Sequence, residues 1–220
     1  MPPTPATRAP ELGLRERKKQ RTRELIAETA RRLFAARGFE RVTIAEVARE
    51  ADVSEQTVFN YFPTKEDLVY WRFEGFEDEL LTAIRRRDCG ESVLRAFGRF
   101  VLRRRGLLAE QDPEARQRLL EITRMITASP ALLERERAIF DRYTESLALL
   151  VAEELGPRAD EVLPRVVANA LMGIHRALLD YSRKRILADA PSDTIIRELR
   201  ARGERAISAL ENGLGEVGIR

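Results

Sequence analysis

The chain has 220 residues, of which 44% are hydrophobic and 34% are charged, so it can fill the core of one large helical domain or of a small domain joined to a larger one. Cys89 and His175 are its only cysteine and histidine, which excludes an intrachain disulfide and leaves no plausible zinc or haem cluster. The longest charge-free apolar stretch is about half of the roughly 20 residues that a spanning helix needs, and the N-terminus has no signal-peptide core. We therefore expect a cytoplasmic protein that has no cofactor, no metal and no membrane partner.

Basic charge is concentrated near the N-terminus. The formal net charge is only +3, but residues 1–65 hold 13 Lys/Arg against 9 Asp/Glu, whereas residues 66–220 hold 26 against 27. Six of the nine residues from Arg15 to Arg23 are basic and one is acidic. Such a cluster is typical of a solvated helix start or of a surface for an anionic partner, and charge alone leaves both open.

The hydrophobic pattern predicts an all-α protein, because the alternation typical of strands occurs nowhere over a useful length. Residues 1–13 contain four prolines and are predicted to form a disordered tail. A helical pattern then begins near Leu14 and ends at Gly38, a residue type that commonly follows a helix.

Three helix starts follow in close succession. Thr43, Ser54 and Thr64 can each cap a helix, and each has an apolar residue before it and another five positions later. Glu46 and Asp67 stand where a capping box places its reciprocal acid. This spacing leaves room only for very short helices, so residues 43–62 are predicted to form a helix, a tight turn at 51–53 and a second helix.

Longer helices are predicted beyond Thr64. The first should run without interruption to about Arg87, and further helices are expected at about 91–108, from Asp112-Pro113, from Ser129-Pro130 to Gly156-Pro157, at about 160–187 and at 192–212. The domain boundaries are predicted at 1–13 for the tail, 14–63 for a basic helix-turn-helix module and 64–220 for a larger helical domain. A continuous helix would join the two domains.

The second short helix should have two different faces. Val58, Phe59 and Phe62 are predicted to pack into the core. The opposite side carries short or planar side chains with donors and acceptors, namely Gln56, Thr57, Asn60 and Tyr61. Such groups suit a DNA major groove, where Asn and Gln can pair with adenine and a Thr methyl can touch a thymine methyl. A three-helix subdomain with a merely polar surface is the alternative.

The remaining polar residues of this region have supporting roles in the same hypothesis. Tyr61, Lys65 and Thr43 would reach phosphates, and Ser54 would cap the helix. Glu55 either favours the helix dipole or accepts a hydrogen bond from a cytosine amino group. The DNA-binding residues are therefore predicted to be Thr43, Ser54, Glu55, Gln56, Thr57, Asn60, Tyr61 and Lys65.

The run GFERVTIAEVAREADVSEQTVFNYFPTKEDL, residues 38–68, closely resembles the TetR family of transcriptional regulators. The matching features are Gly38-Phe39, Thr43-Ile44, Val47-Ala48, Ala51, Val53-Ser54, Thr57, Tyr61-Phe62, Lys65 and Leu68. With the preceding helix, the resemblance covers about 50 residues. Two positions depart from the family: Asp52 stands where glycine is common, and Phe59 stands where tyrosine is common and lacks its hydroxyl.

The resemblance implies a ligand-responsive regulator that binds double-stranded DNA as a homodimer and has a small-molecule effector. By analogy we expect a repressor of a palindromic operator; an activator or an effector-independent DNA-binding protein is the alternative. The last two helices would form the dimer interface through Val162, Val166, Val167, Ala170, Leu171, Ile174, Leu178, Ile195, Ile196, Leu199, Ile207 and Leu210. An enzyme is not expected, since the chain has neither paired Glu-x-x-His motifs nor a G-x-S-x-G nucleophile elbow.

The effector would lie between helices of the larger domain. Aromatic, methionine and polar residues at helical spacing are the candidates for its pocket. They are Trp71, Phe76, Phe97, Phe100, Met125, Phe140, Tyr143, Asn169, Met172, His175 and Arg176. Each of them could equally be an ordinary core or interface residue.

Overall fold

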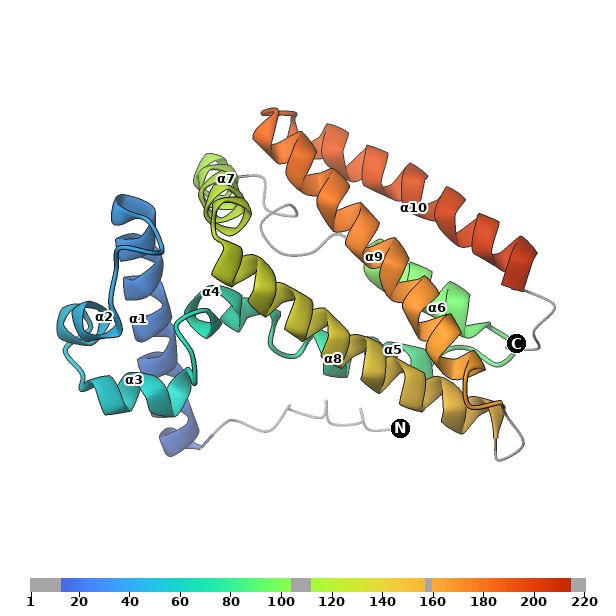
Figure 1. Cartoon of the computed structure of the whole chain (residues 1–220), viewed down its shortest axis with the longest axis horizontal. Helices are drawn as coiled ribbons and strands as arrows, with labels where there is room; N and C mark the ends of the chain where they lie inside the picture. Colours follow the sequence, from blue (N-terminus) through green and yellow to red (C-terminus); the bar gives the residue numbers. More distant parts are fainter. Residues whose placement is uncertain (1–12, 104–111, 157–159, 215–220) are drawn as a thin grey trace, which may run out of the picture. The chain divides into compact units, whose positions relative to one another are not determined.

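The computed structural model describes residues 13–103, 112–156 and 160–214, and in these ranges it contains helices and turns but no strand (Figure 1). The predicted all-α class is confirmed. The predicted tail lies outside the described residues except for Gly13, and so does the end of the helix predicted at 91–108. The chain divides into two compact units, Met1–Arg72 and Phe73–Arg220. No helix among the described residues is long and apolar enough to cross a membrane.

The described part of the first unit contains four helices. They are α1 (Leu14–Arg37), α2 (Ile44–Glu50), α3 (Glu55–Tyr61) and α4 (Asp67–Tyr70), followed by the 3-10 turn η1 (Trp71–Phe73). Helix α1 packs on α2 and α4, and α2 packs on α3. Their shared core contains Ile26, Ala30, Phe34, Phe39, Val42, Val47, Val58, Phe62 and Leu68. Gly38 ends α1 with a φ of +84°, and its N–H donates to the carbonyl of Phe34 at 2.8 Å.

In the second unit, the residues that the structure describes form a bundle of six helices. They are α5 (Phe76–Arg85), α6 (Val93–Val101), α7 (Pro113–Ala128), α8 (Pro130–Leu155), α9 (Leu163–Leu187) and α10 (Ser192–Leu214). Helix α9 packs along α8, α10 and α7, while α5 and α6 pack on each other (Figure 1). Asp112 and Ser129 cap α7 and α8, each ahead of a proline in the first turn, as the sequence predicts.

The prediction of one continuous helix from Thr64 to about Arg87 is wrong. Helix α4 ends at Tyr70, η1 follows, and Gly75 adopts the left-handed conformation with a φ of +85° before α5 begins. A left-handed residue cannot continue α-helical hydrogen bonding. The three-and-four apolar spacing continues across the break because α4 and α5 each bury one face, the first through Leu68 and the second through Leu80.

Two glycines allow α6 and α10 to approach closely. A Cβ added to Gly98 would lie 2.3 Å from Cδ1 of Ile207, and one added to Gly203 would lie 2.2 Å from Cδ2 of Leu102. Helix α10 therefore packs its apolar side against its own chain.

This packing reduces the set of residues that are free to form the predicted dimer interface, which itself stays a prediction. Five of the predicted residues are buried within the single chain: Val167, Leu171, Ile174, Ile195 and Ile207. Val162, just before α9, is 64% exposed, and Val166, on α9, is 48% exposed. The sequence pattern shows the same apolar spacing for all of these positions. Only the packing of the chain distinguishes the buried residues from the exposed ones.

Candidate nucleic-acid interface

Helices α2 and α3 are joined by the predicted tight turn. The amide of Val53 donates to the carbonyl of Ala48 at 3.0 Å, and Asp52 adopts a φ of +53°. Aspartate tolerates this left-handed region better than most residues, so the turn forms without the glycine that the family often has. The resulting unit is a helix-turn-helix.

Helix α3 is fixed by its cap and its buried side. The Ser54 hydroxyl accepts a hydrogen bond from the amide of Thr57 at 3.1 Å, and the two hydroxyls lie 2.8 Å apart. Val58 and Phe62 are fully buried, and the guanidinium carbon of Arg23 lies 5.3 Å from the ring centre of Phe62. These contacts determine which side of α3 remains open to solvent.

Two amides lie side by side on that open side. Nε2 of Gln56 donates to Oδ1 of Asn60 at 3.1 Å, and both side chains are exposed. Oδ1 has a second lone pair and Nδ2 of Asn60 keeps both of its N–H donors, so Asn60 retains an acceptor and donors for a ligand. Glu55 is also exposed, whereas Thr57 and Tyr61 are half-buried.

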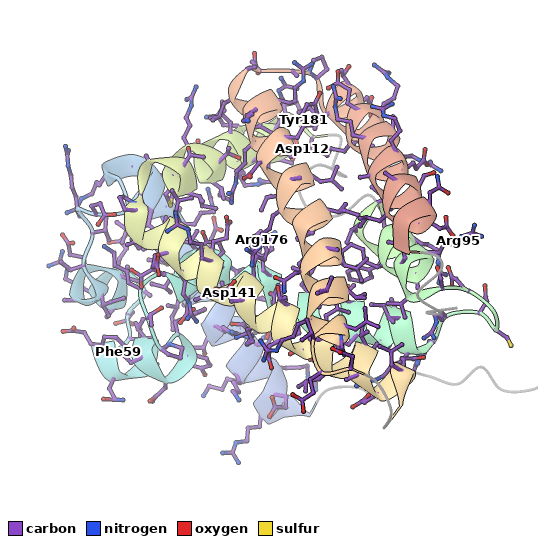
Figure 2. The ribbon with its side chains drawn as sticks, turned by 45° about the vertical axis from the view of Figure 1, so that its right-hand side comes forward. Phe59, Arg95, Asp112, Asp141, Arg176 and Tyr181 are labelled. Carbon is purple, nitrogen blue, oxygen red and sulfur yellow. The ribbon has the colours of Figure 1, made fainter. Side chains whose placement is uncertain are left out.

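Phe59 is not in the core, contrary to the sequence prediction. Its side chain is 44% exposed on α3 (Figure 2). The helix has only two turns, and the buried stripe is already formed by Val58 and Phe62, four residues apart. Phe59 follows Gln56 by three positions and therefore lies on the amide side of the helix.

Two of the three residues predicted to contact phosphates, Lys65 and Thr43, make contacts within the first unit. The ammonium of Lys65 lies 4.2 Å from the ring centre of Phe39 and makes a cation–π contact. The Thr43 hydroxyl accepts from the amide of Glu46 at 3.2 Å, and the Glu46 carboxylate accepts from the amide of Thr43 at 2.8 Å, which completes the predicted capping box.

The capping box also determines the charge of Glu46. The hydrogen bond from the Thr43 amide, followed by that from the guanidinium of Arg37 at 2.7 Å, lowers the pKa of Glu46 from 4.5 to about 2. The carboxylate therefore stays ionised at neutral pH and well below it. Arg37 and Glu46 also connect the end of α1 to the first turn of α2.

Five of the predicted effector residues come together in one aromatic cluster. Phe76 stacks on Tyr143 at 5.4 Å and on His175 at 5.0 Å between ring centres, and it meets Phe100 edge-on at 5.3 Å. Phe140 meets His175 edge-on at 5.4 Å. The cluster joins α5, α6, α8 and α9, and its rings are in contact with one another.

Polar groups border this cluster. The Tyr143 hydroxyl donates to the carbonyl of Phe73 at 3.2 Å, and burial raises the pKa of Tyr143. The guanidinium of Arg176 lies 5.6 Å from the ring centre of Phe140 and donates to Asp141 at 2.8 Å (Figure 2). Nε of Arg176 is buried and has no hydrogen-bond partner among the described residues.

The other predicted effector residues do not join the cluster as ring contacts. Phe97 and Met172 are fully buried, and Met125 is half-buried. Asn169 is exposed and donates to the carbonyl of Arg165 at 2.8 Å. Trp71 belongs to the first compact unit, whereas the other predicted residues belong to the second.

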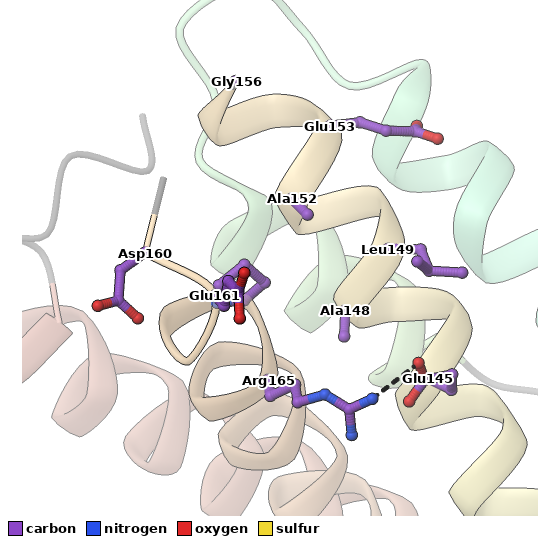
Figure 3. Close-up of a pocket in the computed structure, with 10 residues that line it drawn as sticks. Glu145, Ala148, Leu149, Ala152, Glu153, Gly156, Asp160, Glu161 and Arg165 are labelled. Atoms are coloured by element: carbon purple, nitrogen blue, oxygen red, sulfur yellow. Dashed lines mark hydrogen bonds and ion pairs between the residues drawn. The ribbon is translucent and has the colours of Figure 1, made fainter. Parts of the chain in front are cut away.

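Surface hollows of the second unit lie elsewhere. One of about 640 Å³ lies between α8 and α9 (Figure 3), and another of about 820 Å³ lies between α6 and α10. In the first, Arg165 donates to Glu145 at 3.0 Å, and Asp160 accepts from the amides of Val162 and Leu163 at the start of α9. None of the predicted effector residues borders these two hollows.

The fold and the open side of α3 define a helix-turn-helix protein, and comparison with known proteins gives its family. Residues 26–73 match the bacterial regulatory proteins of the tetR family, and residues 91–214, more than half of the chain, match the MftR C-terminal domain. The chain belongs to the TetR family and is a DNA-binding transcriptional regulator.

Relatives and solved structures agree with this assignment. TcmR of Streptomyces glaucescens, an HTH-type transcriptional regulator, is 27% identical over 212 residues, which cover 94% of this chain and 91% of TcmR. MftR of Mycobacterium tuberculosis, a regulator named after mycofactocin biosynthesis, is 26% identical over 165 residues, which cover 72% of this chain and 78% of MftR. Native NalD, the secondary repressor of the MexAB-OprM multidrug efflux pump in Pseudomonas aeruginosa, shares the fold with a TM-score of 0.53 at 20% identity over 85% of this chain and 96% of NalD.

The pKa of Glu46 leads to a prediction about stability and pH. Because folding lowers this pKa from 4.5 to about 2, the carboxylate stabilises the fold at neutral pH, and that contribution is lost as the pH falls from about 4.5 towards 2. Glu46→Gln keeps an acceptor for the cap but removes the charge. We expect it to lower the urea midpoint of the full chain at pH 7, with a smaller deficit at pH 3.5.

The matched control is Glu50→Gln at the end of the same helix. Glu50 pairs with Arg32 at 3.9 Å with both side chains largely exposed, so its loss should have little effect on the midpoint at either pH. A Glu46→Gln deficit that stays constant from pH 7 to pH 3.5 would contradict the assignment.

Proposed function

We propose that this regulator is a homodimeric repressor that binds a palindromic operator and leaves it when a small molecule binds. The observation that carries the proposal is the open side of α3, where Gln56 and Asn60 hold their amides together beside a capped helix start. Family membership supports DNA binding, and repression is the mode that is commoner in the family.

Helix α3 would enter the major groove with its amide side towards the bases. Asn60 would pair with adenine through the donor and acceptor that remain after its contact with Gln56, and that contact would limit the rotation of both amides. The Thr57 methyl would touch a thymine methyl, because the hydroxyl of Thr57 is turned towards Ser54. Glu55 favours the helix dipole at the first position of α3.

Phosphate contacts would come from the residues that border α3. Tyr61 is half-buried with its hydroxyl available at the end of the helix, and Lys65 would leave the Phe39 ring to reach a phosphate. Thr43 has its hydroxyl engaged in the capping box, so its role would be to hold α2 in place. Such contacts position the protein without reading sequence.

The dimer would form through the last two helices, α9 and α10. Val166 offers an exposed apolar side chain on α9, and Gly173 has open space where a side chain would stand. A two-fold dimer places equivalent patches against each other, so α9 would cross its copy near these residues. Its two α3 helices would then meet half-sites about 34 to 36 Å apart or a multiple of that.

The effector would act through the aromatic cluster. Its rings are in contact, so a ligand would separate them, and it would stabilise whichever bundle geometry leaves more room around Phe76. Phe76 begins α5 directly after the segment Phe73–Gly75, which follows the first unit in the chain. The ligand can shift DNA affinity only by binding the two geometries with different affinity.

The close contacts of this cluster favour one alternative, an effector-independent DNA-binding regulator. A thermal-shift screen of small molecules separates the two, because a ligand of the folded state raises the melting temperature by mass action.

We further propose the boundaries 14–63 and 64–220 for the two functional domains, and a cytoplasmic location, where DNA is accessible.

Removing a side chain that reads a base and removing one that binds a phosphate should change DNA affinity in different ways. Asn60→Ala should relax base preference at one operator position, with a loss of about 1 to 3 kcal/mol on the specific site and little loss on random DNA. Lys65→Ala should weaken binding to all sequences alike and lower the slope of log affinity against log salt by about one. Fluorescence anisotropy over a salt series measures both. Equal losses on specific and random DNA for Asn60→Ala would sink the base-reading role.

The proposed dimer can be tested at Val166. Val166→Asp places an unpaired charge in the interface but leaves the isolated chain little changed, because the side chain is half exposed there. We expect a folded monomer by light scattering at micromolar concentration, where the wild type is a dimer. Leu25→Asp, at an exposed apolar position on α1, is the control and should remain dimeric. A dimeric Val166→Asp variant would rule out this interface.

A further inference from the structure

Phe59 is an aromatic side chain that the protein leaves partly exposed to solvent. It is 44% exposed, while Val58 and Phe62 fill the core beneath the same helix. A phenylalanine gains most from burial, and its exposure on a seven-residue helix gives the fold little. Its position suggests a contact made only with a partner.

The neighbours of Phe59 identify the surface to which it belongs. It lies three residues after Gln56 and directly before Asn60, whose amides are joined by a 3.1 Å hydrogen bond. Figure 2 shows Phe59 on α3. An apolar ring and a pair of amides therefore share one exposed side of the helix.

We propose that Phe59 is a specificity-determining residue that contacts the 5-methyl group of thymine. This inference rests on the proposed function, since it requires α3 to enter the major groove. A phenyl ring has no hydrogen-bonding group, so it can neither bind a phosphate oxygen nor pair with a base edge. The thymine methyl is the apolar group that the major groove offers, and only A·T pairs carry it.

The arrangement also predicts where that thymine lies. Asn60 can pair with an adenine, and Phe59 and Asn60 lie on either side of Gln56, which neighbours both at three and four positions. The two side chains should therefore read the same or adjacent base pairs in each half-site. The preferred operator should carry an A·T pair at both of these contacts.

Uracil scanning isolates the methyl group. In a duplex selected from a random pool by the wild-type chain, each thymine is replaced in turn by deoxyuridine, which keeps the pairing and the O4 acceptor and lacks only the methyl. We expect one or two positions per half-site at which uracil weakens wild-type binding about fourfold, the effect of exposing one buried apolar carbon. Phe59→Ala should bind the thymine duplex about that much more weakly and lose its sensitivity to uracil at those positions.

Three matched variants assign the effect. Phe59→Tyr keeps the ring and should keep the uracil sensitivity. Thr57→Ser removes only a methyl and keeps the hydroxyl that faces Ser54, so it should lose sensitivity at a different thymine or at none. Circular dichroism melting should show that Phe59→Ala is fully folded at the temperature of the binding measurements, because Val58 and Phe62 keep the core filled.

The possible failures are distinct. If the wild type selects a defined sequence but uracil has no effect, or if Phe59→Ala keeps the full uracil sensitivity, the role of Phe59 is overturned while the proposed function stands. If the wild type enriches no sequence at all, both the proposed function and this inference fail.

Discussion

The candidate DNA interface depends on the burial of one side of a helix that could not form alone. Helix α3 has seven residues, far fewer than an isolated helix needs in water. Its conformation is maintained by the fully buried Val58 and Phe62 and by the Ser54 cap, and its orientation by the turn at Asp52. Because Val58 and Phe62 occupy the buried side of the helix, Gln56, Asn60 and Phe59 lie on its exposed side.

The connection between the two compact units constrains any account of regulation. A continuous helix would transmit a tilt as a rigid lever, but the chain instead passes through η1 and the left-handed Gly75 between α4 and α5. Any signal carried along the chain between the units would pass through this segment, which is not a continuous helix. The hydrogen bond from Tyr143 to the carbonyl of Phe73 gives the aromatic cluster a direct contact with the end of η1.

Features determined by local chemistry could be predicted from the sequence. The caps at Thr43, Ser54, Asp112 and Ser129 and the turn at Asp52 follow from residue types at fixed offsets, and the structure has all of them. Features that depend on which residues a side chain packs against in the fold could not be predicted. The periodic pattern treats Phe59 like Val58, although a two-turn helix has room for only one buried stripe.

In the larger unit, too, the sequence could not show which apolar side chains pack within the chain. Ile207 and Val167 have the spacing of an interface, but Gly98 lets α10 approach α6 so closely that the apolar side of α10 is used within the chain. The pairing of Gln56 with Asn60 follows an ordinary four-residue spacing and could have been proposed from sequence. The cation–π contact of Lys65 with Phe39 could not, since 26 residues separate the pair and only the fold brings them together.

The central claim is that two copies of this chain read DNA through the open side of α3. Selection of bound duplexes from a random pool by the full-length protein tests it most directly, because the enriched sequences report specificity, symmetry and spacing together. The account predicts an inverted repeat with A·T pairs in each half-site and half-site centres about 10 to 10.5 base pairs apart, or a multiple of that. Enrichment of no sequence, or of a single site without two-fold symmetry, would contradict it.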